Sequence, residues 1–315
     1  MLKRNTQHTL KKSVRCTGVG VHSGEEANLT IRPAEADTGI LFIRTDVTDK
    51  ERNIPAHWDN VVDTRMCTVL GNKDGVTIST VEHLMAALRG CGVDNAIVKI
   101  DGPEIPIMDG SSGAFVDMIE KSGLEDQKSP RKAIRIKNSV VCREENKETH
   151  LTPADGCFYS FEIEFASKAI GKQDYTVQLM NGNFRDEISK ARTFGFLHEV
   201  EALQKLGLAK GGSLDNAIVI DQDKVLNKDG LRYENEFVRH KILDAVGDLY
   251  LAGMPIIGHF HGIRSGHDTN NKILKELFAD EKNWEVVILE DQGCRVCDES
   301  TKNFRQGLSG GVALA

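Results

Sequence analysis

The chain of 315 residues lacks a basic excess, a signal peptide and any long apolar run. Lys and Arg total 40 against 47 Asp and Glu, so bulk electrostatics give no reason to expect a nucleic-acid partner. No apolar run approaches the roughly 18 to 20 residues that cross a bilayer. The basic start MLKRNTQHTLKKSV has no apolar core behind it. We therefore expect a cytoplasmic protein without a transmembrane segment, in which a few placed cations would hold any phosphate of a substrate.

A disulfide framework is also missing. The seven cysteines are odd in number and scattered, which favours reduced cytosolic thiols. Cys294 and Cys297 have C-x-x-C spacing, but no second pair of that spacing supplies the remaining ligands of a structural zinc. A thioredoxin-like site would need a βαβ context that is not evident. The pair therefore receives no function.

What the chain does contain is an alternation of apolar and polar residues that predicts strands in both halves, for example at residues 26–34 and 159–165. In each half a helix, a strand, a turn with Gly and Ser and a second helix then follow in that order, over residues 83–110 and 240–266. This self-similarity indicates a duplicated unit. We expect an α+β protein of two similar domains, each a β-sheet layered on α-helices, with an insert in each and the active site in the cleft between them.

The predicted boundaries follow composition. The N-terminal domain spans residues 1–125, the polar segment 126–132 is a linker, and the C-terminal domain spans residues 133–300. The tail 301–315 ends in small and apolar residues and is expected to be flexible. Such an end could serve as a protease-recognition tag. Nothing in the pattern demands more than a monomer.

The segment EFVRHKILDAVGD, residues 236–248, places titratable groups on a mostly apolar helix. His240 and Asp244 are four residues apart and share one helix face, and Asp248 lies one turn further on. Zinc accepts such N and O ligands, and a catalytic zinc usually takes three of them and keeps one position open. Alternatively, the histidine caps a neighbour and the aspartate is solvated, and the pair alone does not decide.

A third ligand is available in STVEHLMAA, where Glu82 and His83 are adjacent at a helix start. Neighbours on a helix lie about 100° apart, so His83 could bind a metal while Glu82 acts as general base toward water. Alternatively, Glu82 is the capping-box partner of Ser79, three residues before it. The H-E-x-x-H motif of zinc peptidases is absent, so any metal site would join the two halves.

Two further histidine motifs stand out. In RSGHDTNNK, His267 follows a turn and begins a helix; protonated, it could stabilise an oxyanion and protonate a leaving amine, with Asp248 keeping its pKa high. It could equally be a surface residue. In GHFHG, His259 and His261 share one strand face, as in many metal sites, but no acid or cysteine accompanies them at a matching spacing.

Seven segments in order, spanning about residues 5 to 290, resemble the UDP-3-O-acyl-N-acetylglucosamine deacetylases of bacterial lipid A synthesis. They are GVGVHSG, STVEHLMAAL, EIPIMDGS, ISKARTFGF, GGSLDNAIV, DGLRYENEFVRHKILDAVGDL and SGHDTNN. The resemblance implies a zinc-dependent amidase with one ion per chain. Its substrate would be UDP-3-O-acyl-N-acetylglucosamine, and its products acetate and UDP-3-O-acyl-glucosamine.

The resemblance also implies roles for individual side chains. The implied zinc ligands are His83, His240 and Asp244. The implied catalytic residues are Glu82, His267, Asp248, Thr193 and Lys241. Among them, Glu82 is the general base, and His267 is the general acid that Asp248 orients. Thr193 donates a hydrogen bond to the oxyanion, and Lys241 is the family's active-site lysine.

For the substrate, the resemblance implies contacts from Phe161, Phe194, Arg264 and Lys241. Phe161 and Arg264 match positions that contact the nucleotide, although Arg264 stands where lysine is more usual. The insert near residues 194–220 matches one that lines a hydrophobic tunnel for the acyl chain. A smaller insert is expected near residues 40–60.

Two alternatives stay open at this point. One is another zinc amidohydrolase that acts on a different N-acetylated sugar, and the other is a non-catalytic protein that binds a nucleotide sugar. The preferred acyl length depends on packing that spacing does not reveal. Zinc and iron are not distinguished by N and O ligands alone.

Overall fold

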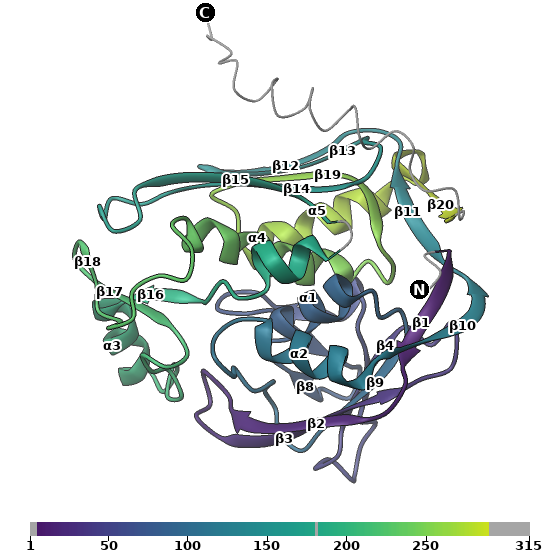
Figure 1. Cartoon of the computed structure of the whole chain (residues 1–315), viewed down its shortest axis with the longest axis horizontal. Coiled ribbons are helices and arrows are strands. Elements are labelled where there is room, and N and C mark those ends of the chain that lie inside the picture. The colour runs from purple at the N-terminus through teal and green to yellow at the C-terminus, as the bar shows by residue number, and fades with distance from the viewer. Residues whose placement is uncertain (1–4, 180–181, 290–315) are drawn as a thin grey trace, which may run out of the picture.

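Alternating burial builds the N-terminal sheet. The computed structural model describes residues 5–179 and 182–289. In β3 (Glu26–Pro33), Ala27, Leu29 and Ile31 point into the core while their neighbours face outward. The sheet order is β2 (Val14–Val19), β3, β9 (Ala96–Ile100), β4 (Ile40–Arg44) and β5 (Asn53–Pro55). Helices α1 (Glu82–Cys91) and α2 (Gly113–Ser122) cover its inner face (Figure 1).

The C-terminal half repeats this construction. Its sheet contains β12 (Val140–Glu144), β13 (Lys147–Thr152), β19 (Ile256–Ile263), β14 (Cys157–Glu164) and β15 (Lys172–Gln178). Strands β11 (Lys132–Ile136) and β20 (Trp284–Ile288) extend it beside β19. Helices α4 (Glu236–Tyr250) and α5 (His267–Ala279) lie on its inner face, so the molecule has four layers: sheet, helices, helices, sheet (Figure 1).

The two sheets share one topology. The central strand β9 pairs antiparallel with β3 and parallel with β4. The central strand β19 likewise pairs antiparallel with β13 and parallel with β14. Each central strand lies between two helices in sequence, α1 and α2 or α4 and α5. The prediction of an α+β protein with two similar layered domains is confirmed.

Helices α1 and α4 meet at the centre of the molecule, where a glycine permits close approach. A Cβ atom on Gly247 would lie 2.0 Å from the carbonyl oxygen of Glu82, a distance no side chain tolerates. The start of α1 therefore lies directly against the last turn of α4. This contact brings polar residues of the two halves together.

The predicted linker is more ordered than its polarity indicated. Strand β10 (Leu124–Pro130) pairs antiparallel with β1 (Thr6–Leu10), and β11 begins at Lys132. Residues 126–132 therefore lie mostly in strands, because backbone hydrogen bonds to β1 order a segment that has no apolar alternation. The boundaries of the domains stay predictions.

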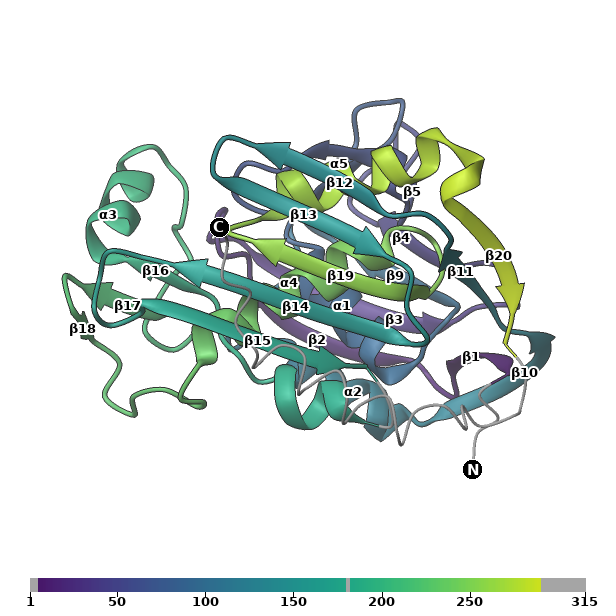
Figure 2. The ribbon, with the colours of Figure 1, turned by 90° about the horizontal axis from the view of Figure 1, so that it is seen from above.

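Two small sheets stand apart from the main ones. Strands β16 (Phe194–Phe196), β17 (Ile218–Asp221) and β18 (Lys224–Val225) form one, beside helix α3 (Leu197–Lys205), at one end of the molecule (Figures 1 and 2). These elements lie in and just after the range 194–220, where an insert is expected, and its role stays a prediction. The other contains β6 (Val61–Asp63), β7 (Val69–Gly71) and β8 (Thr77–Ile78).

The smaller insert expected near residues 40–60 needs a correction, since that range contributes β4 and β5 to the main sheet. The small sheet that stands apart from the main sheet in this half lies at residues 61–78 instead. Single helical turns at Trp58–Asn60, Phe184–Ile188 and Glu281–Asn283 complete the elements. Within the described ranges, no helix combines the length and the apolar character needed to span a bilayer.

Several predictions concern residues outside the described ranges. The pair Cys294 and Cys297 and the tail 301–315 lie there. Protease recognition of the tail therefore stays a prediction, as do the monomeric state and the cytoplasmic location.

Candidate metal centre and active site

Three predicted metal ligands converge between α1 and α4. His83, His240 and Asp244 are buried, and their donor atoms form a group able to hold a metal ion. The Nε2 atoms of His83 and His240 lie 3.5 and 3.3 Å from Asp244 Oδ1. Ligands about 2.0 to 2.1 Å from a tetrahedral ion lie roughly 3.3 to 3.5 Å apart. Asp244 Oδ1 is buried and makes no hydrogen bond within the described residues, so the donor set fits a divalent cation.

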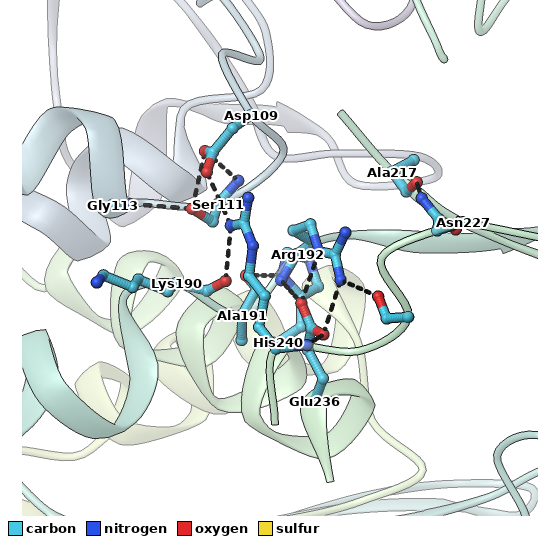
Figure 3. Close-up of polar contacts among 12 residues, drawn as sticks. Asp109, Ser111, Gly113, Lys190, Ala191, Arg192, Ala217, Asn227, Glu236 and His240 are labelled. Atoms are coloured by element: carbon cyan, nitrogen blue, oxygen red, sulfur yellow. Dashed lines mark hydrogen bonds and ion pairs between the residues drawn. The ribbon is translucent and has the colours of Figure 1, made fainter. Parts of the chain in front are cut away.

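Neighbouring groups orient these donors. His240 Nδ1 donates to the carbonyl oxygen of Ala191 at 3.0 Å, which leaves Nε2 to face Asp244 (Figure 3). Burial lowers the pKa of His240 to about 3, so the imidazole is in its neutral, ligating form. Lys241 Nζ donates to Asp244 Oδ2 at 2.7 Å. Burial raises the pKa of Asp244, but His240 and Lys241 outweigh it and hold that pKa well below its ordinary value.

A buried ion pair fixes the segment that carries Ala191 and Thr193. Arg192 Nε and Nη2 donate to Glu236 Oε1 and Oε2 at 2.8 and 3.1 Å (Figure 3). The backbone N–H of Arg192 also donates to Glu236 Oε1, at 3.0 Å. Glu236 is the first residue of α4 and is fully buried. The ion pair thus ties this segment to the helix that bears His240.

Glu82 is not a helix cap. Its Oε2 accepts from the backbone N–H of Thr68 at 3.1 Å, whereas the hydroxyl of Ser79 donates to the carbonyl oxygen of Pro103. Helix α1 has Val81 at its N-cap and no side-chain cap. The capping-box reading is therefore wrong. Burial raises the pKa of the Glu82 carboxyl, as suits a group that exchanges a proton.

His267 begins α5 and faces Glu82. Its Nε2 lies 3.8 Å from Glu82 Oε1, and its Nδ1 lies 2.8 Å from Asp248 Oδ2. Burial lowers the pKa of His267, but the carboxylates of Asp248 and Glu82 outweigh it and raise that pKa to about 9. The imidazole is therefore protonated at neutral pH, and it is not the surface residue that a loop setting could have implied.

Sequence reasoning missed two partners of Asp248. Thr68 Oγ1 donates to Asp248 Oδ1 at 2.6 Å, and Asn270 Nδ2 donates to Oδ2 at 2.9 Å. Asn270 lies three residues after His267 in SGHDTNN, so helical spacing was an available signal. Thr68 lies in a loop far in sequence from α4 and α5, and no local sequence pattern indicated its contact with Asp248.

Two cavities adjoin these groups. The larger, about 650 Å³, is lined by both histidine ligands, Glu82, His267 and Lys241. Apolar side chains from the insert near residues 194–220 and the segment after it also line this larger cavity, namely Leu197, Val200, Leu203, Leu214, Val219 and Leu226. The smaller, about 410 Å³, is lined by Lys241, Arg264 and Phe165. Thr193 and Phe194 line both cavities, so the two spaces adjoin at the catalytic groups.

Phe161 is the predicted substrate-binding residue that lines neither cavity. It is 1% exposed, and its ring packs near that of Phe260. Phe165 follows β14 directly and lines the smaller cavity beside Arg264. The phenylalanine of this segment that lines a cavity is thus Phe165, four positions further along.

His22 is a cavity residue to which sequence reasoning gave no role. It lines the larger cavity, and the backbone N–H groups of His22 and Ser23 donate to Glu104 at 2.9 and 2.8 Å. His22 lies in the motif GVGVHSG and Glu104 in EIPIMDGS, so both motifs were recognised in the sequence, but neither residue was given a role.

Comparison with known proteins gives a consistent result. Residues 7–279 match the model of a family described as UDP-3-O-acyl N-acetylglycosamine deacetylase. Proteins named UDP-3-O-acyl-N-acetylglucosamine deacetylase from Teredinibacter turnerae and Pasteurella multocida are each 49% identical over 288 residues, 91% of this chain and 94% of theirs. The protein of that name from Hahella chejuensis is 50% identical over 289 residues, 91% of this chain and 95% of its own.

Proposed function

Because this chain belongs to the UDP-3-O-acyl N-acetylglycosamine deacetylase family, we propose that it hydrolyses the N-acetyl group of UDP-3-O-acyl-N-acetylglucosamine. The products are acetate and UDP-3-O-acyl-glucosamine, in an early step of lipid A biosynthesis. The observation that carries the proposal is the convergence of His83, His240 and Asp244 with Glu82 and His267 on one cavity.

The metal in this proposal is one zinc ion per chain, held by His83, His240 and Asp244. Their donor atoms have the mutual spacing of tetrahedral ligands, and Asp244 Oδ1 is buried without a hydrogen bond among the described residues. A bound zinc ion supplies a Lewis acid that polarises the amide carbonyl and lowers the pKa of water to about 7. Lys241 keeps the second oxygen of Asp244 occupied and so directs the first toward the imidazoles.

Glu82 is the general base of the proposed reaction. Its carboxylate takes one proton from the attacking water, and its raised pKa makes it a stronger base than an exposed glutamate. The water oxygen forms a bond to the acetyl carbon while negative charge develops on the carbonyl oxygen. Protonated His267 and the Thr193 hydroxyl both border the cavity and stabilise that charge.

His267 is the general acid. As the C–N bond breaks, its Nε2 proton moves to the departing glucosamine nitrogen. Asp248 accepts from Nδ1 and therefore keeps the ring oriented with Nε2 toward the cavity. Over the reaction Glu82 gains one proton and His267 loses one, so the pair of residues carries the same number of protons before and after it.

The two cavities divide the substrate between them. The apolar wall of the larger cavity suits a 3-O-acyl chain, each buried methylene of which contributes about 0.8 kcal/mol. Lys241 and Arg264 supply positive charge for the diphosphate at the smaller cavity, and Phe165 offers a ring face for the nucleotide. These placements support a nucleotide sugar that carries a lipid chain.

The test of the proposal is metal analysis of the purified chain together with turnover. We expect about one equivalent of zinc, and His240→Ala should lose both the zinc and the activity, because two ligands hold the ion too weakly. A metal content near zero would favour the nucleotide-sugar binding protein. Equal turnover with and without the 3-O-acyl group would favour a different zinc amidohydrolase, and iron in place of zinc would change only the identity of the ion.

A further inference from the structure

The histidine pair of β19 lies on a face of the fold that the proposed reaction does not use. Burial alternates along β19, so Phe260 points into the core while His259 and His261 point to the outer face of the sheet. Figure 2 looks onto this face, where β12, β13, β19, β14 and β15 lie side by side. The helices α4 and α5 lie behind the sheet in this view.

Strand pairing brings further possible metal ligands beside His259 and His261, which the spacing in the sequence did not show. His261 lies directly opposite His150 of β13 and Ser160 of β14 in the register of the sheet. The rings of His150 and His261 have centroids 6.0 Å apart, and those of His259 and His261 lie 6.2 Å apart with planes inclined by 8°. Three of the ten histidines in the chain therefore gather on one small area of the surface.

Carboxylates accompany these rings. Glu162 Oε1 lies 3.0 Å from His261 Nε2, and Glu148 Oε2 lies 3.0 Å from His150 Nε2. Glu148 is also shared with Arg143, whose Nε lies 3.4 Å away. In the described part of the chain, by contrast, the ion-pair partner of Glu162 is His261. Glu162 is thus the carboxylate that is more available to bind a metal ion, because no arginine or lysine pairs with it in the described residues.

We propose that His150, His261 and Glu162 form a second metal site, for a divalent transition ion such as Zn²⁺ or Ni²⁺. Residues directly opposite on paired strands have Cβ atoms about 4.5 to 5.5 Å apart, a separation that two imidazoles bridge through one ion. Imidazole nitrogen and carboxylate oxygen are ligands that such ions accept, and solvent fills the remaining positions.

In their present rotamers the ligand atoms of His150, His261 and Glu162 do not all lie within 4.8 Å of one another. The backbone holds the three residues side by side, and rotation of the side chains closes the site. The sheet fixes the strands, whereas the three ligand side chains are partly exposed, and exposed side chains change rotamer within nanoseconds. An ion replaces the two present histidine–glutamate hydrogen bonds with coordination bonds. His259 is left out of the ligand set because its Nε2 is already bonded to Ser160 Oγ at 2.7 Å.

The first test is retention of the untagged full-length chain on immobilised Ni²⁺, eluted with rising imidazole. It is independent of the proposed reaction, because the buried ligands of the catalytic centre cannot reach a column-bound ion. His150→Gln/His261→Gln should elute at a clearly lower imidazole concentration than the wild type. The matched control is His57→Gln, since His57 is an exposed histidine beside a single carboxylate, Asp59, and it should elute with the wild type. Co-elution of the double variant with the wild type would overturn the proposal.

The second test is calorimetric titration of Ni²⁺ into the zinc-loaded protein. We expect one site, weakened at least roughly tenfold by Glu162→Gln, since a lost ligand costs no less than a lost neighbour of a ligand. Glu148→Gln should bind Ni²⁺ as the wild type does. Equal weakening by both variants would overturn the assignment of Glu162, and no binding to the wild type would overturn the site itself. Single substitutions at partly exposed glutamates keep this test valid even where the double histidine variant unfolds.

Discussion

Glu82 and Glu236 each begin a helix in one half of the molecule, yet their surroundings differ. Each is the first residue of the helix that precedes the central strand of its sheet, and each is buried. In each half, the helix that precedes the central strand thus begins with a buried glutamate. What the two carboxylates can do depends on the groups that the rest of the chain places beside them.

The hydrogen-bond partners of the two carboxylates differ in number and in charge. Glu236 accepts four hydrogen bonds, two from the guanidinium of Arg192 and two from the backbone N–H groups of Arg192 and Arg232. Glu82 accepts one from the Thr68 N–H and has a histidine 3.8 Å from its other oxygen, at the wall of a cavity. A saturated carboxylate is a structural tie, whereas a carboxylate with a free oxygen beside a cavity can exchange a proton. A glutamate at the start of a corresponding helix therefore does not predict the same role in the two halves.

The largest expected effect that separates the two glutamates is on the rate. Glu82→Gln should lower kcat by roughly two to four powers of ten, because a neutral amide cannot accept the proton of water. The zinc content and the thermal unfolding midpoint should change little, since Glu82 is not among the proposed ligands. Steady-state kinetics with metal analysis on the same sample measures this. Full activity in the variant would assign the base to another residue.

The opposite result is expected for Glu236→Gln, whose main effect is on stability. Removing one charge leaves the Arg192 guanidinium buried without its counter-ion, a change that typically costs about 3 to 5 kcal/mol. Denaturant unfolding of both glutamine variants measures the difference. A destabilisation by Glu82→Gln as large as that by Glu236→Gln would remove the distinction drawn here.

Much of this site was accessible from sequence because its spacing is local. His240, Asp244 and Asp248 follow helical periodicity, and the order of elements in each half revealed the duplication before any topology was known. The role of Glu82 was ambiguous for a physical reason, since a buried general base and a capping-box partner occupy the same position after a serine. Only the contacts of Ser79 and Thr68 separate the two readings.

Other features depend on pairings that periodicity does not encode. Phe161 and Phe165 are four positions apart, so strand alternation would place both on the same face and gives no means to choose between them. Because β14 ends at Glu164, Phe165 lies just beyond it, at the cavity. Strand β10 is polar because its partner β1 supplies backbone hydrogen bonds rather than apolar contacts. His150 meets His261 through the register of β13 and β19, 111 positions after it in sequence, which no local pattern reports.

A third prediction concerns the proton of His267, whose Nε2 faces Glu82 across the two halves. With its pKa raised to about 9, His267 keeps its proton through neutral pH and loses it as the pH rises past 9. The wild-type profile of kcat/KM should therefore fall on its basic side near pH 9. His267→Gln should lower the rate by roughly two to three powers of ten and flatten that limb, because the titrating group is gone. An unchanged basic limb in the variant would indicate another acid.

The smallest effect is expected where the halves touch. A methyl group on Gly247 would press on the carbonyl oxygen of Glu82, so Gly247→Ala must push α1 and α4 apart. Overpacking of this kind costs about 1 to 3 kcal/mol. The displacement also separates His83 on α1 from Asp244 on α4, so zinc affinity should fall together with stability. The matched control is Gly113→Ala, at the start of α2, where a Cβ meets no atom closer than 3.3 Å. If Gly247→Ala lost stability and retained full zinc affinity, the contact between the two halves would not be what positions the ligands.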